Sequence, residues 1–260
     1  MPHGDELLAV AVDAARAAGS LLCERFARPR GDVRTKSTPT DLVSEADDAA
    51  EAAIRELLSA RRPNDGILGE EGGDSPGASG LRWVIDPLDG TVNFLFGIPH
   101  WCVSVACEDG DGTVAGVVHD PLRAETFTAL RGAGARLAGE PIAGSTASDL
   151  AVALVATGFS YDAEVRAAQA AVAARLLPAV RDLRRAGSAA LDLAWTACGR
   201  HDAFYERGLQ PWDRAAGALV CSEAELRLRE LGSRSGLPAG LLAAPEALLE
   251  PLHALIEPPC

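Results

Sequence analysis

Residues 83–94 constrain the fold more than any other segment of this chain. Their apolar run ends at Asp86, proline follows, and a second acid, Asp89, precedes a glycine. This order predicts a buried strand that ends at Asp86, a turn forced by Pro87, and a helix that begins at Thr91. A buried strand needs sheet neighbours and a covering layer, so we expect a layered fold with both carboxylates at its rim.

Hydrophobic spacing in the first part of the chain indicates helices followed by strands. Apolar residues three and four positions apart predict amphipathic helices over 5–27 and from a capping box at 44–47 to about residue 61, with a polar loop over 28–40 between them. Short apolar runs at 67–69 and 81–85 then end in acids, as strands do when they deliver side chains to the edge of a sheet.

The pattern changes twice more along the chain. Strand-like runs separated by turn residues over 101–142 predict an antiparallel meander that ends in a glycine-rich hairpin. Strands and helices alternate after it, and such alternation predicts a sheet covered by helices. The expected strands are 151–156, 179–183, 202–205 and 226–229, and the expected helices are 163–177, 188–198, 213–223 and about 245–256. We therefore predict two lobes, 1–143 and 144–260, that share one site.

Charge and composition exclude several classes of function. The chain has 37 acidic and 24 basic residues, a formal charge of −13, which opposes extended contact with nucleic acid or anionic lipid. Its apolar stretches run about half of the roughly 20 residues that a bilayer span requires. The only lysine is Lys36, so there is no Walker A loop. The 6 cysteines form no CxxC pair, which indicates reduced thiols in a cytoplasmic protein.

Four acids at the predicted edge suggest a metal site. Asp86 and Asp89 are joined there by Glu70, after the preceding strand, and by Asp213, at the start of a helix. A set of oxygen ligands without histidine or cysteine suits Mg²⁺ and argues against zinc. Taken singly, each acid also fits a structural role as a turn residue, a surface charge or a helix cap.

The charge of such a site suggests its substrate. Four carboxylates balance two Mg²⁺ ions, so the loaded site is near neutral and a third ion would attract an anion. Backbone N–H groups at Gly90 and Thr91 open a helix and make phosphate the anion that fits. Metal clusters of this kind hydrolyse phosphate esters by polarising the phosphoryl group and acidifying a bound water.

Two other interpretations of the acidic motifs fail. The haloacid-dehalogenase pattern requires one residue between its acids, and Asp86 and Asp89 have two; it also requires a lysine downstream. An EF-hand starting at Asp109 would place Val114 at the sixth position and Asp120 at the twelfth, where glycine and glutamate are needed.

Six segments resemble, in the correct order, the signatures of the inositol monophosphatase family. They are 41–47, 69–71, 83–94, 187–190, 205–206 and 211–213. The resemblance covers most of the chain to about Glu223. It implies an α/β (α+β) fold, a five-layer αβαβα sandwich of the inositol monophosphatase and sugar phosphatase type. It also implies a homodimer that hydrolyses small phosphomonoesters with Mg²⁺ and is inhibited by Li⁺.

The resemblance also implies a set of metal ligands. Glu70, Asp86 and the carbonyl of Leu88 would bind the first ion, and Asp86, Asp89 and Asp213 would bind the second. Glu70 would also touch a weaker third ion and counts among the catalytic residues.

The remaining roles are implied by the same resemblance. The Thr91 hydroxyl, bonded to Asp47, would orient the attacking water, with no covalent intermediate. The amides of Gly90 and Thr91 would hold phosphate, and Lys36 would lie on a loop beside the site or simply be solvated. The substrate hydroxyls would contact Gly187, Ser188, Ala189 and Glu206.

Residues outside these motifs receive structural assignments. We assign His100 and His201 to structure and Trp83 and Trp101 to the core. The pair at 184–185 is interpreted as an exposed basic pair, with contact to substrate or to a second subunit as the alternative.

One departure from the family stands out. The family usually follows its Pro-Trp-Asp helix with Glu-Ala-Gly-Gly, whereas here Ala224 runs into Glu225 and Leu226. The missing glycine turn puts the local packing, and with it the fit of the substrate, in question.

The leading hypothesis is Mg²⁺-dependent hydrolysis of inositol 1-phosphate to inositol and phosphate by a phosphoric monoester hydrolase. Histidinol-phosphate phosphatase is the nearest alternative on the same fold, with fructose 1,6-bisphosphatase and nucleotide 3′-phosphatase further back. A hypothesis of another class is a binding or regulatory partner with little turnover, as some relatives are in transcription complexes. The charge of −13 weighs against direct RNA binding in that role.

Overall fold

Two long helices form the outermost layer of one side of the molecule. The structure, a computed structural model, describes residues 2–26, 33–35, 42–234 and 236–257. The outer helices are α1 (Pro2–Phe26) and α2 (Glu45–Arg61), where helical spacing predicts them. The buried face of α1 carries small residues with no exposed surface, which let the helix approach the sheet beneath it closely. These residues are Ala11, Ala14, Ala15 and Ala18.

A mixed eight-stranded sheet packs under α1 and α2. Its strands are β3 (Gly66–Gly69), β4 (Gly73–Ser75), β5 (Arg82–Asp89), β6 (Cys102–Asp109), β7 (Gly112–Asp120), β8 (Glu125–Leu130), β9 (Ala135–Leu137) and β10 (Glu140–Ile142). The order is β10-β9-β8-β7-β6-β5-β3-β4, and β6 to β10 form the predicted antiparallel meander. β3 runs parallel to β5, so the carboxyl ends of these two strands lie at the same edge of the sheet.

The path of β5 differs from the sequence prediction. We expected the strand to end at Asp86 with a turn at Pro87, but β5 continues to Asp89. Its pairing with β6 shifts between Asp86, opposite Ser104, and Asp89, opposite Cys102, which is a β-bulge. Proline has no N–H for the ladder, and bulges accommodate such residues. Residues three apart on a regular strand face opposite sides, and the extra residue of the bulge brings both carboxylates to one side.

The middle layer consists of two helices from the second half of the chain. They are α5 (Ala189–Ala197) and α6 (Pro211–Glu223), and they pack against each other. α6 lies on β6 and β7, where the backbone of Ala216 comes within 3.0 Å of the place a Cβ on Gly116 would take. α5 lies against the second sheet. A hydrophobic cluster that includes Val84, Phe127, Leu193 and Phe204 joins both sheets through this layer.

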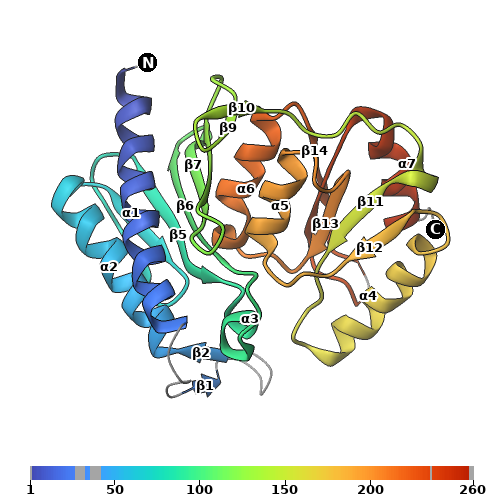
Figure 1. The fold of residues 1–260 in the computed structure, drawn as a ribbon, viewed down its shortest axis with the longest axis horizontal. Coiled ribbons are helices and arrows are strands. Elements are labelled where there is room, and N and C mark those ends of the chain that lie inside the picture. Colours follow the sequence, from blue (N-terminus) through green and yellow to red (C-terminus); the bar gives the residue numbers. More distant parts are fainter. Residues whose placement is uncertain (1, 27–32, 36–41, 235, 258–260) are drawn as a thin grey trace.

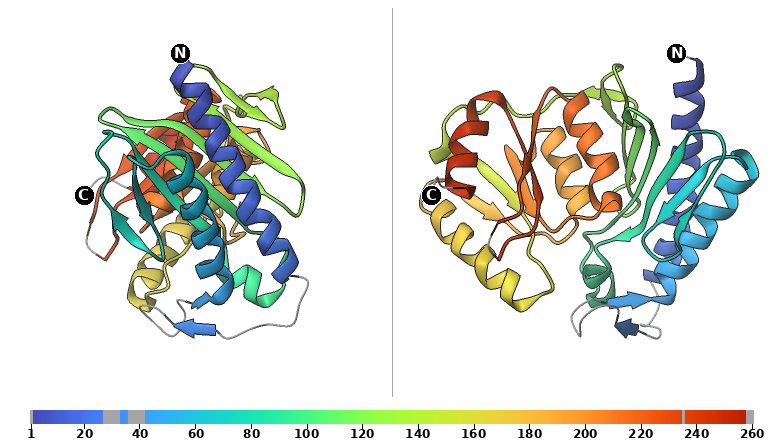
Figure 2. Two further views of the ribbon diagram at one scale, coloured as in Figure 1. Left: turned by 90° about the vertical axis from the view of Figure 1, so that its left-hand side faces the viewer. Right: turned by 180° about the vertical axis from the view of Figure 1, so that it is seen from behind.

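A five-stranded sheet and two outer helices complete the fold. The strands are β11 (Leu154–Thr157), β12 (Asp182–Arg184), β13 (Ala203–Arg207), β14 (Arg227–Leu231) and β15 (Gly240–Ala244), in the order β12-β11-β13-β15-β14. The helices α4 (Ala163–Leu176) and α7 (Glu246–Ile256) pack together outside this sheet. Figure 1 and the reverse view in Figure 2 show helices and sheets alternating as αβαβα, which confirms the predicted five-layer sandwich.

Several short elements were not predicted. β1 (Val33–Thr35) lies within the expected polar loop and pairs with β2 (Leu42–Ser44), which follows it. β4 and β15 were also missed. The strand predicted at 151–156 begins as a 3₁₀ turn, η1 (Leu150–Val152), before β11, and the one predicted at 179–183 is displaced to β12. Segments of three polar or irregular residues, such as β4, carry no period that a sequence pattern reveals. β15 is a buried run of five small and apolar residues, and a run this short does not distinguish a strand from a helix segment.

The first sheet lies within residues 66–142 and the second within 154–244. The lobes 1–143 and 144–260 remain a prediction, because the middle helices join one hydrophobic cluster with strands of both sheets.

The tryptophans, the cysteines and the helix lengths bear on the assignments made from the sequence. Trp83 and Trp101 are fully buried, as assigned. The cysteines in the described part of the chain are free thiols. Within that part, no helix is long and apolar enough to cross a bilayer.

The missing glycine turn is replaced by a strained residue. Glu225, directly after the end of α6 at Ala224, has a φ of 68°, in the left-handed region that favours glycine.

Candidate active site

The residues predicted to bind metal, phosphate and polyol line one cavity of about 610 Å³ between the two halves of the chain. Its first-half wall consists of Glu70, Asp86, Leu88, Asp89, Gly90 and Thr91. Its second-half wall draws on three segments, 158–162, 185–189 and 206–213. The acid of the Pro-Trp-Asp motif, Asp213, therefore lines the same cavity as the acids that flank Pro87.

Asp86 is the electrostatic centre of the first-half wall. Its side chain is 1% exposed, and its Oδ1 accepts a hydrogen bond of 3.0 Å from the Leu88 amide across the bulge. Burial raises its pKa well above the usual value, and the charges of Glu70, Asp89 and Asp213 raise it further. A neighbour on the same strand and two acids from other segments thus act on one carboxylate, which is the convergence that the sequence predicted.

Glu70 reaches this edge because α2 holds its turn. Glu51, buried in α2, accepts hydrogen bonds of 2.8 Å from the amides of Glu71 and Gly72. Its Oε1 also lies 2.6 Å from Nε of Arg55. The Glu70 amide donates to the carbonyl of Ile85 on β5 at 3.3 Å. Glu51 was not singled out from the sequence, where it is one of several acids on a helix.

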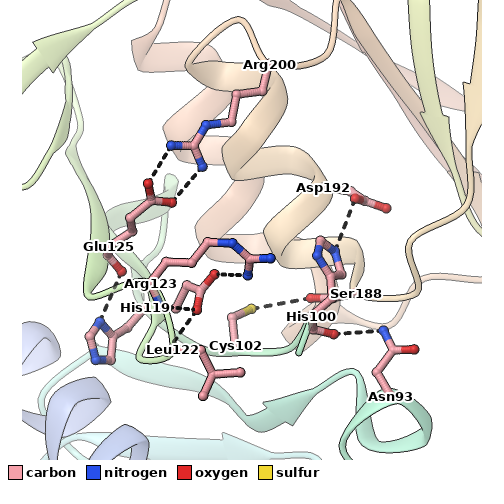
Figure 3. A network of polar contacts seen from close by, with 11 residues as sticks. Asn93, His100, Cys102, His119, Leu122, Arg123, Glu125, Ser188, Asp192 and Arg200 are labelled. Atoms are coloured by element: carbon pink, nitrogen blue, oxygen red, sulfur yellow. Dashed lines mark hydrogen bonds and ion pairs between the residues drawn. The ribbon is translucent and has the colours of Figure 1, made fainter. Parts of the chain in front are cut away.

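Asp89 connects the two walls. Its Oδ2 accepts hydrogen bonds from the Ser188 hydroxyl at 2.6 Å and the Ala190 amide at 2.7 Å, at the start of α5. Burial raises the pKa of Asp89, and these donors lower it, as expected for a carboxylate at a helix N-terminus. The Cys102 thiol donates to the same oxygen at 3.8 Å and lies 3.5 Å from the Ser188 hydroxyl (Figure 3).

Asp213 is both a cap and a cavity residue. It is the third residue of α6, and its Oδ2 accepts a 2.7 Å hydrogen bond from the Gln210 amide, so the cap role considered for it is real. Ser104, which pairs with Asp86 across the first sheet, donates its hydroxyl to the carbonyl of Trp212 at 3.2 Å. This bond fixes the start of α6 beside the acids of β5.

Thr91 and Asp47 contact each other as the resemblance implies. The Thr91 hydroxyl donates to Oδ1 of Asp47, which is buried at the start of α2, at 2.8 Å. The same hydroxyl lies 3.1 Å from the carbonyl oxygen of Leu88. The single hydroxyl hydrogen of Thr91 therefore has two acceptors within reach, and Thr91 itself lines the cavity.

Gly90 and Asn93 fix the short helix α3 (Thr91–Phe96) beside the cavity. Gly90 has a φ of 104°, and a Cβ there would lie 3.1 Å from the carbonyl oxygen of His100, so only glycine fits. Asn93 donates to that carbonyl at 2.7 Å (Figure 3). It also donates to the carbonyl of Ala186 at 2.8 Å. Asn93 thereby ties the first-half wall to the loop that leads into α5.

Glu206 belongs to the second-half wall, on β13. Burial raises its pKa well above the usual value, and the charges of Asp192, Asp213 and Asp89 raise it further. A Cβ on Gly158 would lie 2.1 Å from Oε1 of Glu206, so the carboxylate fills the space that a side chain at 158 would take.

Some of the remaining residues predicted to contact the substrate lie in the described part of the chain. Gly187, Ser188 and Ala189 line the second-half wall, although the Ser188 hydroxyl is directed to Asp89. Lys36 and Asp41 lie outside the described residues.

Among the described residues no three His, Cys, Asp or Glu side chains form a ready-made metal cluster. The donor set nevertheless fits a hard cation: Asp89 and Asp213 are carboxylates close enough to raise the pKa of Asp86, and Leu88 adds a carbonyl.

Comparisons with known proteins show the family of this chain. The sequence profile of the inositol monophosphatase family matches residues 3–252. The chain is 46% identical over 237 residues, 86% of its length and 81% of the relative's, to inositol-1-monophosphatase SuhB of Mycobacterium tuberculosis. It is 44% identical over 220 residues, 84% of its length and 82% of the relative's, to Nus factor SuhB of Escherichia coli K12. The chain belongs to the inositol monophosphatase family.

A solved structure supports the same membership. The extragenic suppressor protein suhB from Bartonella henselae superposes with a TM-score of 0.91 at 35% identity, covering 98% of this chain and 100% of that one. The layered fold of this family member is thus shared along its whole described length.

The sequence analysis gave no role to Asp192, a buried acid near the site of this family member. His100 and Asp192 face each other with 3.6 Å between Nε2 and Oδ1, both buried (Figure 3). Burial raises the pKa of Asp192 to about 6, although His100 lowers it. His201, also buried, has its pKa lowered to about 4 by burial. Assigning both histidines to structure left Asp192, a single acid in an apolar helix, without a role.

Proposed function

We propose that this family member is a Mg²⁺-dependent phosphoric monoester hydrolase that converts inositol 1-phosphate to inositol and phosphate. The observation that carries the proposal is the convergence of Asp86, Asp89 and Asp213 on one cavity. Asp86 and Asp89 come from β5 and Asp213 comes from the start of α6, and the charges of Asp89 and Asp213 both raise the pKa of Asp86. Such clustering of acids is unfavourable without a cation, which makes it a mark of function.

The proposed metal ligands are those implied by the family resemblance. Glu70, Asp86 and the Leu88 carbonyl would hold the first Mg²⁺, and Asp86, Asp89 and Asp213 the second. Glu70 would also contact a weaker third ion. When bound, Mg²⁺ supplies polarisation of the phosphoryl group and a water of lowered pKa.

The chain's own residues position the reactants. Thr91 gives its hydrogen to Asp47, so its oxygen keeps a lone pair that accepts a hydrogen bond from the attacking water. Asp47 cannot turn away, because it is buried at the start of α2. The two residues thus orient the water toward the phosphorus and receive its proton, without a covalent intermediate.

The substrate would span both walls of the cavity. The amides of Gly90 and Thr91 would donate to phosphate oxygens from the first-half wall. Glu206 and the backbone of 187–189 would contact the hydroxyls of the polyol from the second-half wall. Phosphate release in this arrangement leaves the alcohol beside Glu206.

Other properties of the proposed enzyme are inferred from the family. We infer inhibition by Li⁺, assembly as a homodimer and a cytoplasmic location. The charge of −13 supports the absence of a nucleic-acid or membrane-surface partner.

The test measures phosphate release from inositol 1-phosphate with Mg²⁺, for the wild type, Asp86→Asn and Asp213→Asn. We expect turnover that both substitutions abolish, and Mg²⁺ should raise the melting temperature of the wild type but not of Asp86→Asn. Full activity in either variant would overturn the metal assignment. Histidinol phosphate, fructose 1,6-bisphosphate and a nucleoside 3′-phosphate, measured side by side as kcat/KM, decide among the alternative substrates.

A second candidate function is that of a regulatory binding partner. It is favoured by the 44% identity to a relative named Nus factor SuhB. Negligible turnover on the whole substrate panel, together with partner capture that Asp86→Asn leaves unchanged, would favour this function over the phosphatase.

A further inference from the structure

Six acids line the cavity. Among the described residues that line it, the positively charged side chains are two arginines. Arg207 is engaged within the fold: it is buried, donates to the carbonyls of Gly232 and Pro238, and pairs with Glu257. Arg185 is exposed, and its guanidinium makes no hydrogen bond or ion pair within the described part of the chain. It is thus the cation on these walls that remains available to a ligand.

The position of Arg185 is on the second-half wall. Its Nη1 lies 2.7 Å from the place a Cβ on Gly187 would take, so the guanidinium covers the glycine before α5. Its charge lowers the pKa of Glu206 and of Asp192 against the effect of burial, which places it within electrostatic reach of both. The guanidinium therefore lies on the same cavity wall as Glu206 and within reach of its charge, where the proposed function puts the alcohol portion of the substrate.

We propose that Arg185 determines which leaving alcohols the site accepts, favouring neutral polyols and rejecting alcohols that carry an ammonium or imidazolium group. The proposal rests on the proposed phosphatase function and deepens it. Glu206 alone would attract a cationic leaving group, and the positive charge of Arg185 on the same wall opposes that attraction. Together they offer one acceptor and several donors, the pattern that neighbouring hydroxyls of a polyol satisfy.

The chain supplies a matched control for this residue. Arg184 is the adjacent arginine, equally basic, but it does not line the cavity, and its Nη1 pairs with Asp182 at 2.6 Å on the surface. Arg184→Gln removes the same charge one position away. Arg185→Gln removes the charge at the wall, and Arg185→Lys keeps it without the planar donor group.

The measurement is kcat/KM for inositol 1-phosphate and for histidinol phosphate with Mg²⁺, for the wild type and the three variants. We expect Arg185→Gln to lower the value for inositol 1-phosphate about tenfold and to raise that for histidinol phosphate severalfold. Arg185→Lys should keep the wild-type rejection of histidinol phosphate while losing part of the inositol phosphate activity. Arg184→Gln should leave the ratio within about twofold of the wild type. An unchanged ratio in Arg185→Gln, or an equal shift in Arg184→Gln, overturns the proposal.

A second readout does not depend on turnover. Ligand-observed NMR titrations give the relative affinities of myo-inositol and L-histidinol for each protein. We expect the preference to shift toward L-histidinol in Arg185→Gln alone. An unshifted preference contradicts the role of Arg185 whether or not phosphate is released, whereas a shifted preference in a protein without turnover contradicts only the proposed function. Sedimentation of the same variants detects a subunit contact, since a change of oligomeric state with an unshifted preference also overturns the proposal.

Discussion

The two walls of the cavity are built in different ways. The first-half wall comes from residues 70–91, on one sheet edge and the bulge and helix beyond it. The second-half wall comes from three segments between residues 158 and 213, attached to β11, α5, β13 and α6. The first wall concentrates acids that repel one another around Asp86. The second supplies helix N-termini and Arg185, the available cation among the described lining residues.

Apart from Asp213, a proposed metal ligand on the second-half wall, this difference separates the residues suited to the phosphoryl chemistry from those suited to selecting the alcohol. A wall with three mutually interacting acids is suited to hold cations and phosphate, whatever alcohol is attached. A wall assembled from exposed loop ends tolerates substitution and can adapt to different alcohols. Asp89, bonded to Ser188 and Ala190, is the residue through which the two walls keep their register.

The largest effect is expected at the centre of the first-half wall. Asp86→Asn should lower kcat by at least about 10³-fold, because the lost carboxylate belongs to both proposed ion sites. It should also raise the melting temperature of the metal-free protein. Since the folded-state pKa of Asp86 is raised, its cost to stability is absent at low pH and grows as pH rises, so the gain should be larger at pH 8 than at pH 5. Steady-state assays and thermal melts at both pH values check this. A lower melting temperature at pH 8 would show that Asp86 stabilises the fold.

Sequence reasoning captured the first-half wall because its information is local. The strand run, the Asp-Pro-x-Asp-Gly order and the capping acid lie within a few residues of one another, and the helical and strand periods set the layers. The sequence predicted a turn where β5 has a bulge. Proline is typical of both structures, so Pro87 alone does not distinguish between them.

Apart from Asp213, which the four-acid pattern already indicated, the second-half wall was captured only where the family motifs name a residue. The bond from Ser104 to Trp212 joins residues more than one hundred positions apart, and no local pattern in the sequence indicates it. Arg185 illustrates the limit: next to Arg184 it is one of two basic residues, and only the fold places one at the cavity and the other on the surface.

The second prediction concerns the buried polar groups of α5 and the loop after it. His201 has a folded-state pKa of about 4, so its contribution to stability is lost as pH falls from 6.5 to 4. Asp192 has a folded-state pKa of about 6 against 3.8, so its contribution grows as pH falls over nearly the same range. Each change amounts to about 3 kcal/mol, and the two oppose each other in the wild type.

Single variants should expose the opposing slopes. Relative to the wild type, Asp192→Asn should lose about 3 kcal/mol of unfolding free energy between pH 6.5 and 4, and His201→Gln should gain a similar amount. Urea unfolding at half-unit pH steps provides the measurement. Parallel pH profiles for both variants would mean that these groups titrate alike in the folded and unfolded states.

The third prediction tests the water-orienting pair of the first-half wall. Thr91→Val removes the hydroxyl that donates to Asp47 but keeps the shape of the side chain, so kcat should fall about 10²-fold with KM nearly unchanged. Thr91→Ser keeps the hydroxyl and serves as the control, with activity within about tenfold of the wild type. A rise in KM at constant kcat would instead assign Thr91 to substrate binding.

The smallest effect is expected at the far end of α6, which carries Asp213 at its start. Glu225 adopts a φ of 68° where the family usually has glycine, so Glu225→Gly relieves backbone strain but adds freedom to the unfolded chain. We expect a net gain below about 1 kcal/mol in unfolding free energy, measured by urea denaturation. The start of α6 is held separately, by the Gln210 amide on Asp213 and by the Ser104 hydroxyl on Trp212. The kcat/KM of Glu225→Gly should therefore stay within about twofold of the wild type. A larger change would show that the turn after α6 controls the position of Asp213, and that the two walls depend on each other beyond their contact at Asp89.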